Sequence, residues 1–284
     1  MSAELPVTVI SVTHNSGSVI GAFIDTVPTR AELIIVDNAS TDGTRRVLAT
    51  TRARIVTHDR NLGFGAACNA GARLATGEFL FFVNPDARIR DGAVEALIAA
   101  ARRYPGAAAF NPMLLDEAGK AMLRAPSRFL AGRHSARAGS PETDHEVDVV
   151  SGAALFCRRT AFERSAGFDE RIFLYFEDDD LSLRLLAGGG KLMHVAAAKV
   201  QHHQGRSTAP APSLVGFKNF HWMRSYRYVA EKHGQRFPAT KLTVQTALRL
   251  ATARLTGNRQ EQHKFEGRLA GLRDPIRAPG KPAA

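Results

Sequence analysis

The chain has 284 residues, 44% hydrophobic and 23% charged, a composition typical of a soluble globular protein with ample material for a core. Two cysteines, Cys68 and Cys157, are too few for a disulfide framework or a zinc site, and we expect both in the core. No uninterrupted apolar stretch approaches the roughly 18 residues of a membrane-spanning helix, and the N-terminus lacks the basic region of a secretory signal. These features indicate a cytoplasmic protein.

The formal net charge of +11 is very unevenly distributed. Residues 210–284 carry 14 Lys or Arg against 4 Asp or Glu, whereas residues 1–209 carry 24 against 23. The body is therefore nearly neutral and the C-terminal part is strongly basic. This asymmetry predicts an anionic partner for the C-terminal part, such as a membrane surface, an acidic substrate or a nucleic acid.

Strand and helix patterns alternate along the first third of the chain. The predicted strands are residues 7–13, 33–36, 55–57 and 79–83, and the predicted helices between them are residues 19–26, 44–51 and 66–75. Near-continuous apolar strands separated by helices favour a Rossmann-like α/β fold, in which a mostly parallel sheet is covered by helices on both faces.

The pattern is less regular after the first hundred residues. A helix is expected over residues 91–104, with Asp91 as its N-cap. Residues 112–147 are expected to be mostly loop, and regular structure returns at 147–158. A helix that begins near Asp179 is ended by three glycines. We expect helices at 214–233 and 241–255, and disorder at 274–284.

Pro210 and Pro212 mark a boundary before the basic C-terminal part. We therefore expect three regions: residues 1–105, residues 106–209, and residues 210–284 as a basic helical extension.

Polar residues follow three of the predicted strands at the point where each strand ends. They are residues 13–16 (THNS), residues 37–44 (DNASTDGT) and residues 84–86 (NPD). In open α/β sheets, ligands bind at the carboxyl ends of the strands. Any one of these segments is explained by turn chemistry, but three at one edge of a sheet favour a polar ligand.

Two common nucleotide motifs do not fit the sequence. Residues 63–68 nearly match the dinucleotide fingerprint, but Cys68 replaces the last glycine and the acidic strand end, Asp37, precedes the motif. There is also no GxxxxGK[ST] segment, which excludes a P-loop.

An ordered set of motifs resembles the family-2 inverting glycosyltransferases of GT-A fold. The motifs are residues 36–44 (VDNASTDGT), 61–65 (NLGFG) with Asn69 and Gly71, 84–86 (NPD), 167–170 (GFDE), 173–181 (FLYFEDDDL) and 200–207 (VQHHQGRS). Each motif alone is weak, but the set spans about residues 7–207 in the family's order. The most similar branch is the rhamnosyltransferase-like enzymes, which use nucleotide-activated sugars.

The resemblance implies a nucleotide-sugar-binding half in residues 1–105 and an acceptor-binding and catalytic half in residues 106–209. The donor would be a nucleoside-diphosphate sugar, with dTDP or UDP as the expected nucleotide. Asp37 would accept a hydrogen bond from the imide N–H of a pyrimidine, although a role in capping the following turn remains open. Gly152 would form a wall beside the sugar. The residues implied for the whole donor site are Thr13, Asn15, Asp37, Asn38, Asn61, Gly63, Phe64, Asn69, Asn84, Asp86 and Gly152.

The resemblance also implies a divalent cation, Mn²⁺ or Mg²⁺, because the leaving diphosphate carries negative charge. Asp86 is the expected carboxylate ligand. The family's usual motif has two acids, and here Asn84 stands at the first position. By the same resemblance His202 would be a second ligand, which would favour Mn²⁺ somewhat; a structural role is the alternative for this histidine.

The acids at 177–180 form a second predicted centre. Direct displacement at an anomeric carbon needs a base that takes the proton of the attacking hydroxyl. The family pattern assigns this role to Asp178, with Glu177 and Asp180 orienting it or contacting the acceptor. Capping of a helix N-terminus is the alternative explanation for acids in this position.

Two other functions remain open at this stage. A nucleotidyltransferase would share the nucleotide-binding sheet and the metal-binding acid, but the basic loop expected after its first strand is missing. A nucleic-acid-binding protein would use the aromatic and basic residues of 217–228 for stacking. An amphipathic helix at an anionic membrane has the same composition. Because related enzymes often use lipid-linked acceptors, we expect a peripheral position at the inner face of the cell membrane. We expect no nucleic acid partner. The oligomeric state is left open.

Overall fold

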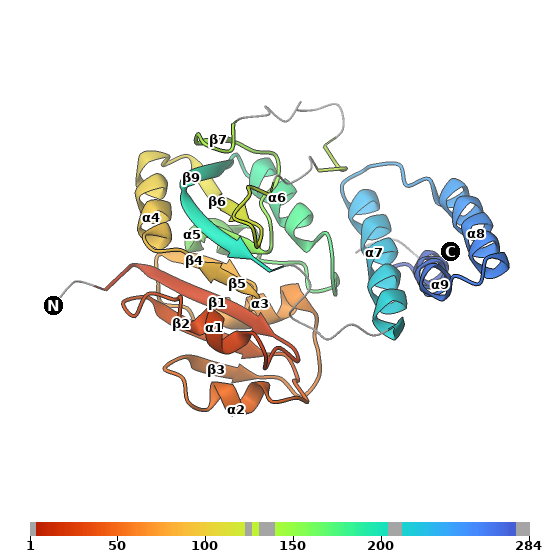
Figure 1. The fold of residues 1–284 in the computed structure, drawn as a ribbon. Helices are drawn as coiled ribbons and strands as arrows, with labels where there is room; N and C mark the ends of the chain where they lie inside the picture. Colours follow the sequence, from red (N-terminus) through yellow and green to blue (C-terminus); the bar gives the residue numbers. More distant parts are fainter. Residues whose placement is uncertain (1–3, 123–126, 131–139, 204–211, 277–284) are drawn as a thin grey trace. The chain divides into compact units, whose positions relative to one another are not determined.

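A computed structural model describes residues 4–122, 127–130, 140–203 and 212–276. The strands in these residues are β1 (Val7–Thr13), β2 (Glu32–Asp37), β3 (Arg54–Thr57), β4 (Phe79–Val83), β5 (Ala87–Ile89), β6 (Ala107–Leu115), β7 (His145–Glu146), β8 (Ala154–Arg158) and β9 (Lys191–His202). The helices are α1 (Ile20–Ile24), α2 (Thr44–Leu48), α3 (Phe64–Ala72), α4 (Ala93–Arg103), α5 (Arg159–Arg164), α6 (Glu177–Ala187), α7 (Pro212–Lys232), α8 (Ala239–Leu255) and α9 (Arg259–Arg273). Figure 1 shows their arrangement.

One mixed sheet contains all the strands of the described residues, in the order β3-β2-β1-β4-β8-β6-β9-β5, with β7 also paired to β9. Strands β3, β2, β1 and β4 run parallel to one another, and β6 runs parallel to β9. Strand β8 is antiparallel to both β4 and β6. The predicted α/β fold with a mostly parallel sheet and flanking helices is therefore confirmed.

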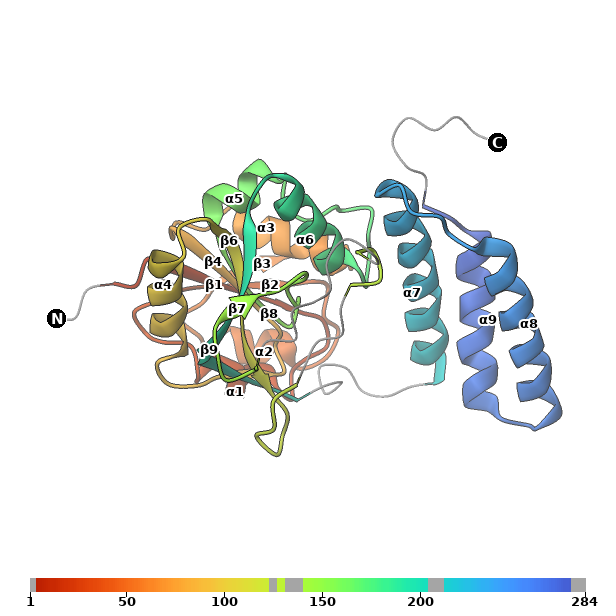
Figure 2. The same ribbon diagram turned by 90° about the horizontal axis from the view of Figure 1, so that it is seen from above.

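Each face of the sheet is covered by its own helices. Side chains alternate along a strand, so Phe79, Phe81 and Val83 of β4 point to one face and Leu80 and Phe82 to the other. Helices α1, α2 and α4 pack on the first face, whereas α3, α5 and α6 pack on the second (Figure 2). Burial on both faces explains why these strands are apolar along their whole length.

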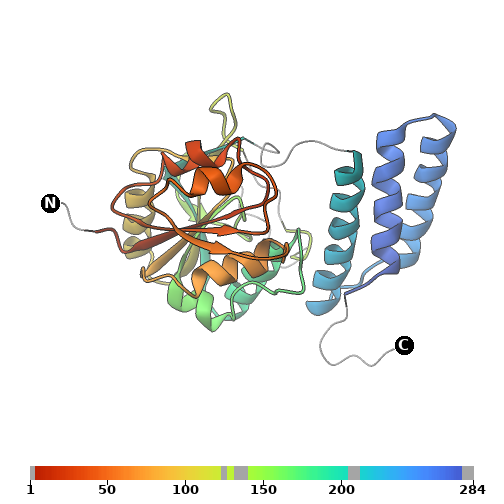
Figure 3. The same cartoon turned by 90° about the horizontal axis from the view of Figure 1, so that it is seen from below.

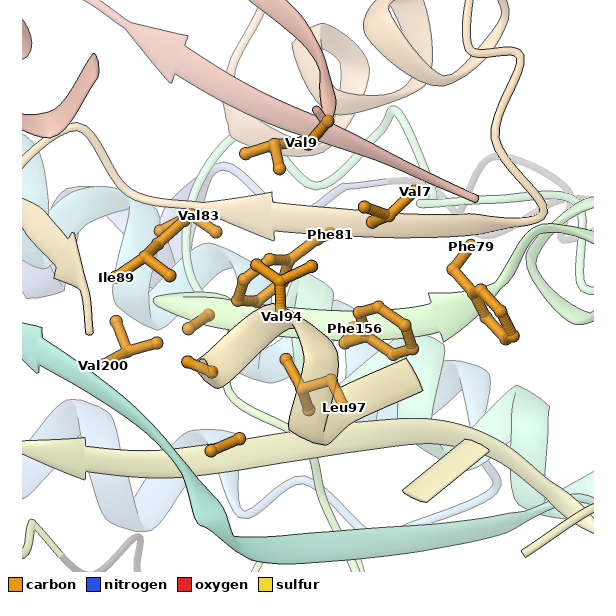
Figure 4. Packing of buried hydrophobic residues seen from close by; sticks show 14 of the residues in the cluster. Val7, Val9, Phe79, Phe81, Val83, Ile89, Val94, Leu97, Phe156 and Val200 are labelled. Atoms are coloured by element: carbon orange, nitrogen blue, oxygen red, sulfur yellow. The ribbon is translucent and has the colours of Figure 1, made fainter. Parts of the chain in front are cut away.

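The core of the first face is built from aromatic and branched side chains. Figure 4 shows Phe79, Phe81 and Phe156 of the sheet beside Val94 and Leu97 of α4. The rings of Phe79 and Phe156 are stacked with centroids 5.0 Å apart. Both cysteines are buried, as predicted, and neither forms a disulfide; burial raises the pKa of the Cys157 thiol.

Three local predictions differ from the structure. Residues 112–115 belong to β6 and not to a loop; the register shifts between Pro112 and Met113, which is where a strand can accommodate a proline that lacks an N–H. Asp91 does not cap α4, because the N-cap residue is Gly92 in the left-handed region (φ 75°), with no side-chain cap. Strand β9 and helix α9 were not predicted.

Residue contacts divide the chain into two compact units. Unit 1 consists of residues 1–169 and 178–208, and unit 2 consists of residues 170–177 and 209–284. The two predicted halves, 1–105 and 106–209, share the single sheet of unit 1. The short segment 170–177 interrupts unit 1 in the sequence and packs within unit 2. The chain continues in unit 1 from Asp178 of α6.

In unit 2, helix α9 lies between α7 and α8 (Figure 3). Glycines allow α9 to approach α7 closely: a Cβ on Gly267 would lie 2.1 Å from the carbonyl oxygen of Gly216, and one on Gly271 would lie 2.4 Å from that of Phe220. Any larger residue at these positions would force the two helices apart.

Segment 170–177 is fixed to α7 by specific contacts within unit 2. Ser225 Oγ donates to the carbonyl of Leu174 (2.9 Å), and Arg171 Nη1 donates to the hydroxyl of Tyr228 (3.0 Å). The ring of Phe176 lies 5.4 Å from that of Trp222, centroid to centroid. Trp222 and Tyr228 thus have partners within unit 2, whereas Phe217 on the same helix is 44% exposed.

His221 of α7 is buried in an aromatic environment. Its ring is stacked on Phe173 at 4.4 Å and meets Phe217 and Phe220 edge to face. Its Nδ1 atom is buried and has no hydrogen-bond partner among the described residues. Burial, assisted by the nearby Arg224 and opposed by Asp274, lowers the pKa of His221 to about 4. The imidazole is thus neutral at physiological pH.

This burial predicts a pH-dependent stability. An unfolded histidine titrates near pH ~6.5, so between that pH and about 4 the unfolded chain binds a proton that the folded chain refuses. The contribution of neutral His221 to the free energy of unfolding is complete above about pH 6.5 and is lost as the pH falls from there to about 4. We expect His221→Phe to reduce the drop in thermal midpoint between pH 7 and pH 5, measured by circular dichroism. His263→Phe on α9 is the control, and an equal reduction in that variant would contradict the assignment.

Candidate active site

Chain segments from both halves of unit 1 meet at one edge of the sheet. Parallel pairing places Thr13 level with Asp37, at the carboxyl ends of β1 and β2. Strand β8 runs the opposite way and begins at this edge, where the N–H of Asn84 donates to the carbonyl of Ala153 (3.0 Å). The carboxyl end of β9 arrives beside them, because His202 pairs with Ala87 of β5. The structure thus brings predicted donor and metal residues to one edge of the sheet.

Asp86 and His202 form a compact pair beside Asn84. Asp86 is 2% exposed, and its Oδ1 atom lies 3.2 Å from His202 Nε2. The Nδ2 atom of Asn84 lies 3.4 Å from the same Nε2. Despite the 3.2 Å approach, Oδ1 of Asp86 makes no hydrogen bond of acceptable geometry within the described part of the chain. If His202 carries its proton on Nδ1, two lone pairs face each other, an arrangement that a cation would stabilise.

The chemistry of this pair fits a divalent cation. A carboxylate oxygen and an imidazole nitrogen suit Mn²⁺, and Mg²⁺ sites commonly use one or two carboxylates together with substrate phosphates. Among the described residues, no cluster of three or more His, Cys, Asp or Glu could hold a metal by itself. The protein therefore offers a partial site, which phosphate oxygens and water would complete. Residues 204–207 of the VQHHQGRS motif lie outside the described residues.

The four consecutive acids at the start of α6 differ in exposure. Glu177, Asp179 and Asp180 are buried, whereas Asp178 is only partly buried. The Oδ2 atom of Asp178 accepts a hydrogen bond from the N–H of Gly152 (2.9 Å), and its Oδ1 accepts from the N–H of Asp179 (2.9 Å). Asp178 is therefore the acid of this cluster that combines a fixed orientation with access to the surface.

The neighbours of Asp178 fix it to the sheet. Ser182, one turn further along α6, donates its hydroxyl to the carbonyl of Asp178 (2.6 Å) and accepts from the N–H of Val150 (3.1 Å). Asn111 of β6 accepts from the N–H of Ser151 (2.8 Å). These bonds connect β6, the loop before β8 and the first turn of α6, so the loop that presents Gly152 is held on two sides.

Asp180 and Asp179 have partners that explain their burial. Asp180 is fully buried and forms an ion pair with Arg184 (Oδ2 to Nε, 2.9 Å). Asp179 Oδ1 accepts from the hydroxyl of Ser127 (2.5 Å). This geometry gives Asp180 a structural role within α6, and its predicted contact with the acceptor finds no support. Glu177 is buried and is the last residue of segment 170–177, which belongs to unit 2.

The two residues before the acids have an unusual backbone. Tyr175 and Phe176 both adopt positive φ, 69° and 65°, although neither is glycine. Such a conformation costs about 1–3 kcal/mol per residue and persists only where the surroundings enforce it. Here the contacts of Phe176 and Leu174 with α7 enforce it. Burial raises the pKa of the Tyr175 phenol, and the Glu177 carboxylate raises it further, so this tyrosine is neutral.

Asp37 is fully buried at the end of β2. Its Oδ1 accepts from the N–H of Ser40 (3.0 Å), as a turn cap would, and its Oδ2 accepts from Nε of Arg45 (2.7 Å). A carboxylate has about four acceptor positions, so these bonds leave capacity for a base. Its role at a nucleotide stays a prediction.

Asn38 and Asn61 organise the loop that leads into α3. The Nδ2 of Asn38 donates to Asn61 Oδ1 (2.8 Å), and its Oδ1 accepts from the N–H of Leu62 (3.0 Å). Asn61 Oδ1 also accepts from the N–H of Gly63 (2.9 Å), a residue with φ of 87°. Phe64 then places its ring next to Gly152, whose Cβ, if present, would lie 3.5 Å from both Phe64 and Asp178. The loop and the acid cluster are thus adjacent.

Of the remaining predicted donor residues, Asn15 and Asn69 have local partners, whereas the buried hydroxyl of Thr13 has none among the described residues. Asn15, with φ of 57°, accepts from the N–H of Thr41 (2.8 Å). Thr13 is fully buried. Asn69 uses both ends of its amide on the backbone of Phe168, donating to its carbonyl (2.9 Å) and accepting from its N–H (2.9 Å). Asn69 therefore acts as a structural clamp, and the geometry does not favour its predicted contact with the donor.

Sequence reasoning missed three residues that support the site: Asn111, Ser127 and Ser182. Each is a small polar residue within an apolar or helical context, and such a residue is buried only when it has a partner. Ser182 was detectable, because it lies one turn after Asp178 on a predicted helix. The partners of Asn111 and Ser127 are far away in the sequence, so no local signal identifies them.

Comparisons with known proteins place the chain in a family. Residues 8–165, more than half of the chain, match the model of glycosyl transferase family 2. The N-acetylglucosaminyl-diphospho-decaprenol L-rhamnosyltransferase of Mycobacterium tuberculosis is 31% identical over 82% of this chain and 86% of its own length. The rhamnosyltransferase WbbL of Escherichia coli is 36% identical over 32% of this chain and 33% of its own length.

Solved structures agree on the fold. GalNAc-T7 with UDP, GalNAc and Mn²⁺ covers 96% of this chain and 57% of that protein, with a TM-score of 0.60 and 15% identity. A mannosyltransferase from Pyrobaculum calidifontis, in complex with GDP-Man and Mn²⁺, covers 95% and 88%, with a TM-score of 0.56 and 18% identity. These identities support the GT-A fold alone. Together with the ordered motifs and the edge they share, the comparisons show that the chain is a glycosyltransferase and belongs to glycosyl transferase family 2.

Proposed function

We propose that this glycosyltransferase moves a hexosyl group, with rhamnosyl as the favoured sugar, from a nucleoside-diphosphate donor to a hydroxyl of a glycan or lipid-linked acceptor. The names of its relatives support this choice of sugar and acceptor. The donor would be dTDP- or UDP-linked. Transfer would proceed with inversion, by direct attack of the acceptor hydroxyl on the anomeric carbon. Membership in the family removes the support for a nucleotidyltransferase.

The single observation that carries this proposal is the geometry of Asp178. It is the partly accessible acid of the cluster, and its Oδ2 atom is fixed by the N–H of Gly152, the residue proposed to border the sugar. A carboxylate in this position can accept the proton of an attacking hydroxyl. The hydrogen bonds from the N–H groups of Gly152 and Asp179 orient this carboxylate.

On the donor side, Asp86 and His202 would hold a divalent cation, with Asn84 beside them. A cation bound there supplies charge neutralisation to the leaving diphosphate. The protein contributes a fixed, buried carboxylate and an imidazole held at the end of β9. Asp37, Asn38 and the loop at Asn61 would line the nucleotide, and Phe64 with Gly152 would border the sugar.

The acceptor is proposed to be at a membrane surface. None of the helices within the described residues is both long and apolar enough to cross a bilayer. The basic charge of residues 210–284 would instead attract anionic headgroups, with each Lys or Arg near the surface contributing about 1 kcal/mol. We place the protein on the cytoplasmic face of the cell membrane, held peripherally, in the synthesis of an envelope polysaccharide.

Metal binding gives the first test. Asp86→Asn is the suitable variant, because Asp86 is buried and an alanine would leave a cavity. We expect Mn²⁺ affinity in the presence of a nucleoside diphosphate to fall at least ~10-fold, since a ligand or its support typically contributes 10–100-fold. Isothermal titration calorimetry measures this affinity, and an unchanged thermal midpoint shows that the fold is intact.

The matched variant is Asn84→Asp, which adds the second acid of the family's usual motif. We expect tighter Mn²⁺ binding than in the wild type, because a second carboxylate would face the same space. Wild-type affinity in Asp86→Asn, or no effect of either substitution, would contradict the assignment of the metal site.

The activity itself is tested by incubating the protein with dTDP-, UDP- and GDP-linked hexoses, Mn²⁺ and a short-chain diphosphate-linked sugar acceptor, with detection of product by mass spectrometry. We expect transfer from dTDP-rhamnose. Asp178→Asn should bind the donor normally and lose turnover by about 10²–10⁴, because the amide is nearly isosteric but cannot accept a proton.

Asp180→Asn is the control within the same cluster. It breaks the ion pair with Arg184, so we expect a lower thermal midpoint with turnover per folded molecule largely retained. An inactive Asp180→Asn beside a normal Asp178→Asn would show that the base is misassigned. Absence of transfer from every nucleotide sugar would contradict the proposed function.

A further inference from the structure

Helix α8 has an apolar face that is not used inside unit 2. Its inner face packs through Leu250 and Ala253 against Phe265 of α9. Its other large apolar side chains point to solvent: Val244 is 53% exposed, Leu248 65% and Leu255 89%. Among the described residues, five large hydrophobic side chains are exposed, and three of them are on this helix.

These exposed side chains form one stripe. At about 100° per residue, positions 244, 248 and 255 fall within about 40° of one another on the helix circumference. The exposed Ala251 lies in the same stripe. Leu250 and Ala253 lie on roughly the opposite side, which agrees with their burial. Helix α8 therefore has two apolar faces: one packs against α9 and the other is exposed to solvent.

The charge of the helix identifies what this outer face can contact. Helix α8 carries Lys241, Arg249 and Arg254 and no acidic residue. Over residues 239–273 there are 7 Lys or Arg and 2 Asp or Glu. By helical position, Lys241 and Arg254 lie on opposite borders of the stripe. Arg254 also forms an ion pair with Glu266 of α9 (2.9 Å). Cations beside a solvent-facing apolar stripe are the pattern of a helix that lies in a membrane interface.

A second copy of the chain is the competing occupant, because positions 244, 248, 251 and 255 also have coiled-coil spacing. Pairing α8 with itself would bring two helices together that each carry three cations and no acid. Like charges across such an interface oppose association, whereas an anionic surface attracts them. Charge complementarity therefore favours a lipid surface.

We propose that the outer face of α8, formed by Val244, Leu248, Ala251 and Leu255, inserts into the headgroup region of an anionic membrane. This inference rests on the proposed function, since it assigns the membrane contact of a lipid-linked acceptor to a defined surface. It assigns the contact to α8 and not to Trp222 and Tyr228 of α7, whose side chains have partners within unit 2.

The test uses the full-length protein and vesicles of phosphatidylcholine with or without phosphatidylglycerol. The stripe variant combines Val244→Ser, Leu248→Ser and Leu255→Ser. The control variant combines Thr243→Ser, Gln245→Ser and Thr252→Ser, which are exposed positions on the same helix outside the stripe. We expect the stripe variant to lower the partition coefficient on anionic vesicles by on the order of tenfold or more, and the control variant to bind like the wild type.

A direct readout of insertion comes from Leu248→Trp, measured against the wild type as background for Trp222. We expect blue-shifted emission on anionic vesicles and quenching by brominated lipids. Equal sedimentation of the stripe variant and the wild type, or no quenching of Trp at position 248, would overturn the proposal. A wild-type dimer that the stripe variant dissociates, or binding of single-stranded RNA without binding of vesicles, would also overturn it.

Activity on a short-chain, water-soluble acceptor distinguishes this inference from the proposed function. Transfer by a protein that does not bind vesicles would contradict the membrane face and leave the proposed function standing. Stripe-dependent vesicle binding without transfer from any nucleotide sugar would support the membrane face and contradict the proposed function.

Discussion

Parallel pairing of β2, β1 and β4 is the constraint on which the site depends. Because these strands run in the same direction, the polar segments after Asp37, Thr13 and Val83 must emerge at the same edge of the sheet. The antiparallel strand β8 then delivers the loop of Gly152 to that edge from the other half of unit 1. Strand direction thus brings the predicted nucleotide and metal residues to one edge, and the hydrogen bond between Gly152 and Asp178 joins the first turn of α6 to it.

Hydrogen bonds hold the first turn of the acid helix α6 at this edge, and the two residues before it have a strained backbone. Gly152 and Ser182 fix the first turn of α6, while the preceding residues, Tyr175 and Phe176, have left-handed backbone conformations. The contacts of segment 170–177 with α7 maintain that conformation at a cost of about 1–3 kcal/mol per residue. The segment that leads into Asp178 is thus stabilised by helix α7 of unit 2, the unit to which the segment itself belongs. Removing α7 would release this segment, so truncation near residue 210 is a poor way to isolate a membrane-binding role.

The parts of the fold that sequence predicts are those with a local signal. The first four strands are continuous apolar runs, and the helices between them have clear polar boundaries, so their order and the α/β class are predictable. Strand β9 has polar residues and three consecutive alanines within it, and it depends on its pairing with β6, which lies more than eighty residues earlier in the chain. The acids of α6 were identifiable, but their division of roles was not. The burial of Asp180 by Arg184 and the selective access of Asp178 follow only from packing.

The central claim is that a hydroxyl oriented by Asp178 attacks the donor directly, on the side opposite the leaving diphosphate. The anomeric configuration of the product tests it most directly, and the one-bond carbon–hydrogen coupling in a nuclear magnetic resonance spectrum of the purified product reports that configuration. Single displacement predicts a configuration opposite to that of the donor sugar. A product with the donor's configuration would require a covalent intermediate or a different attacking geometry, and would contradict the role assigned to Asp178.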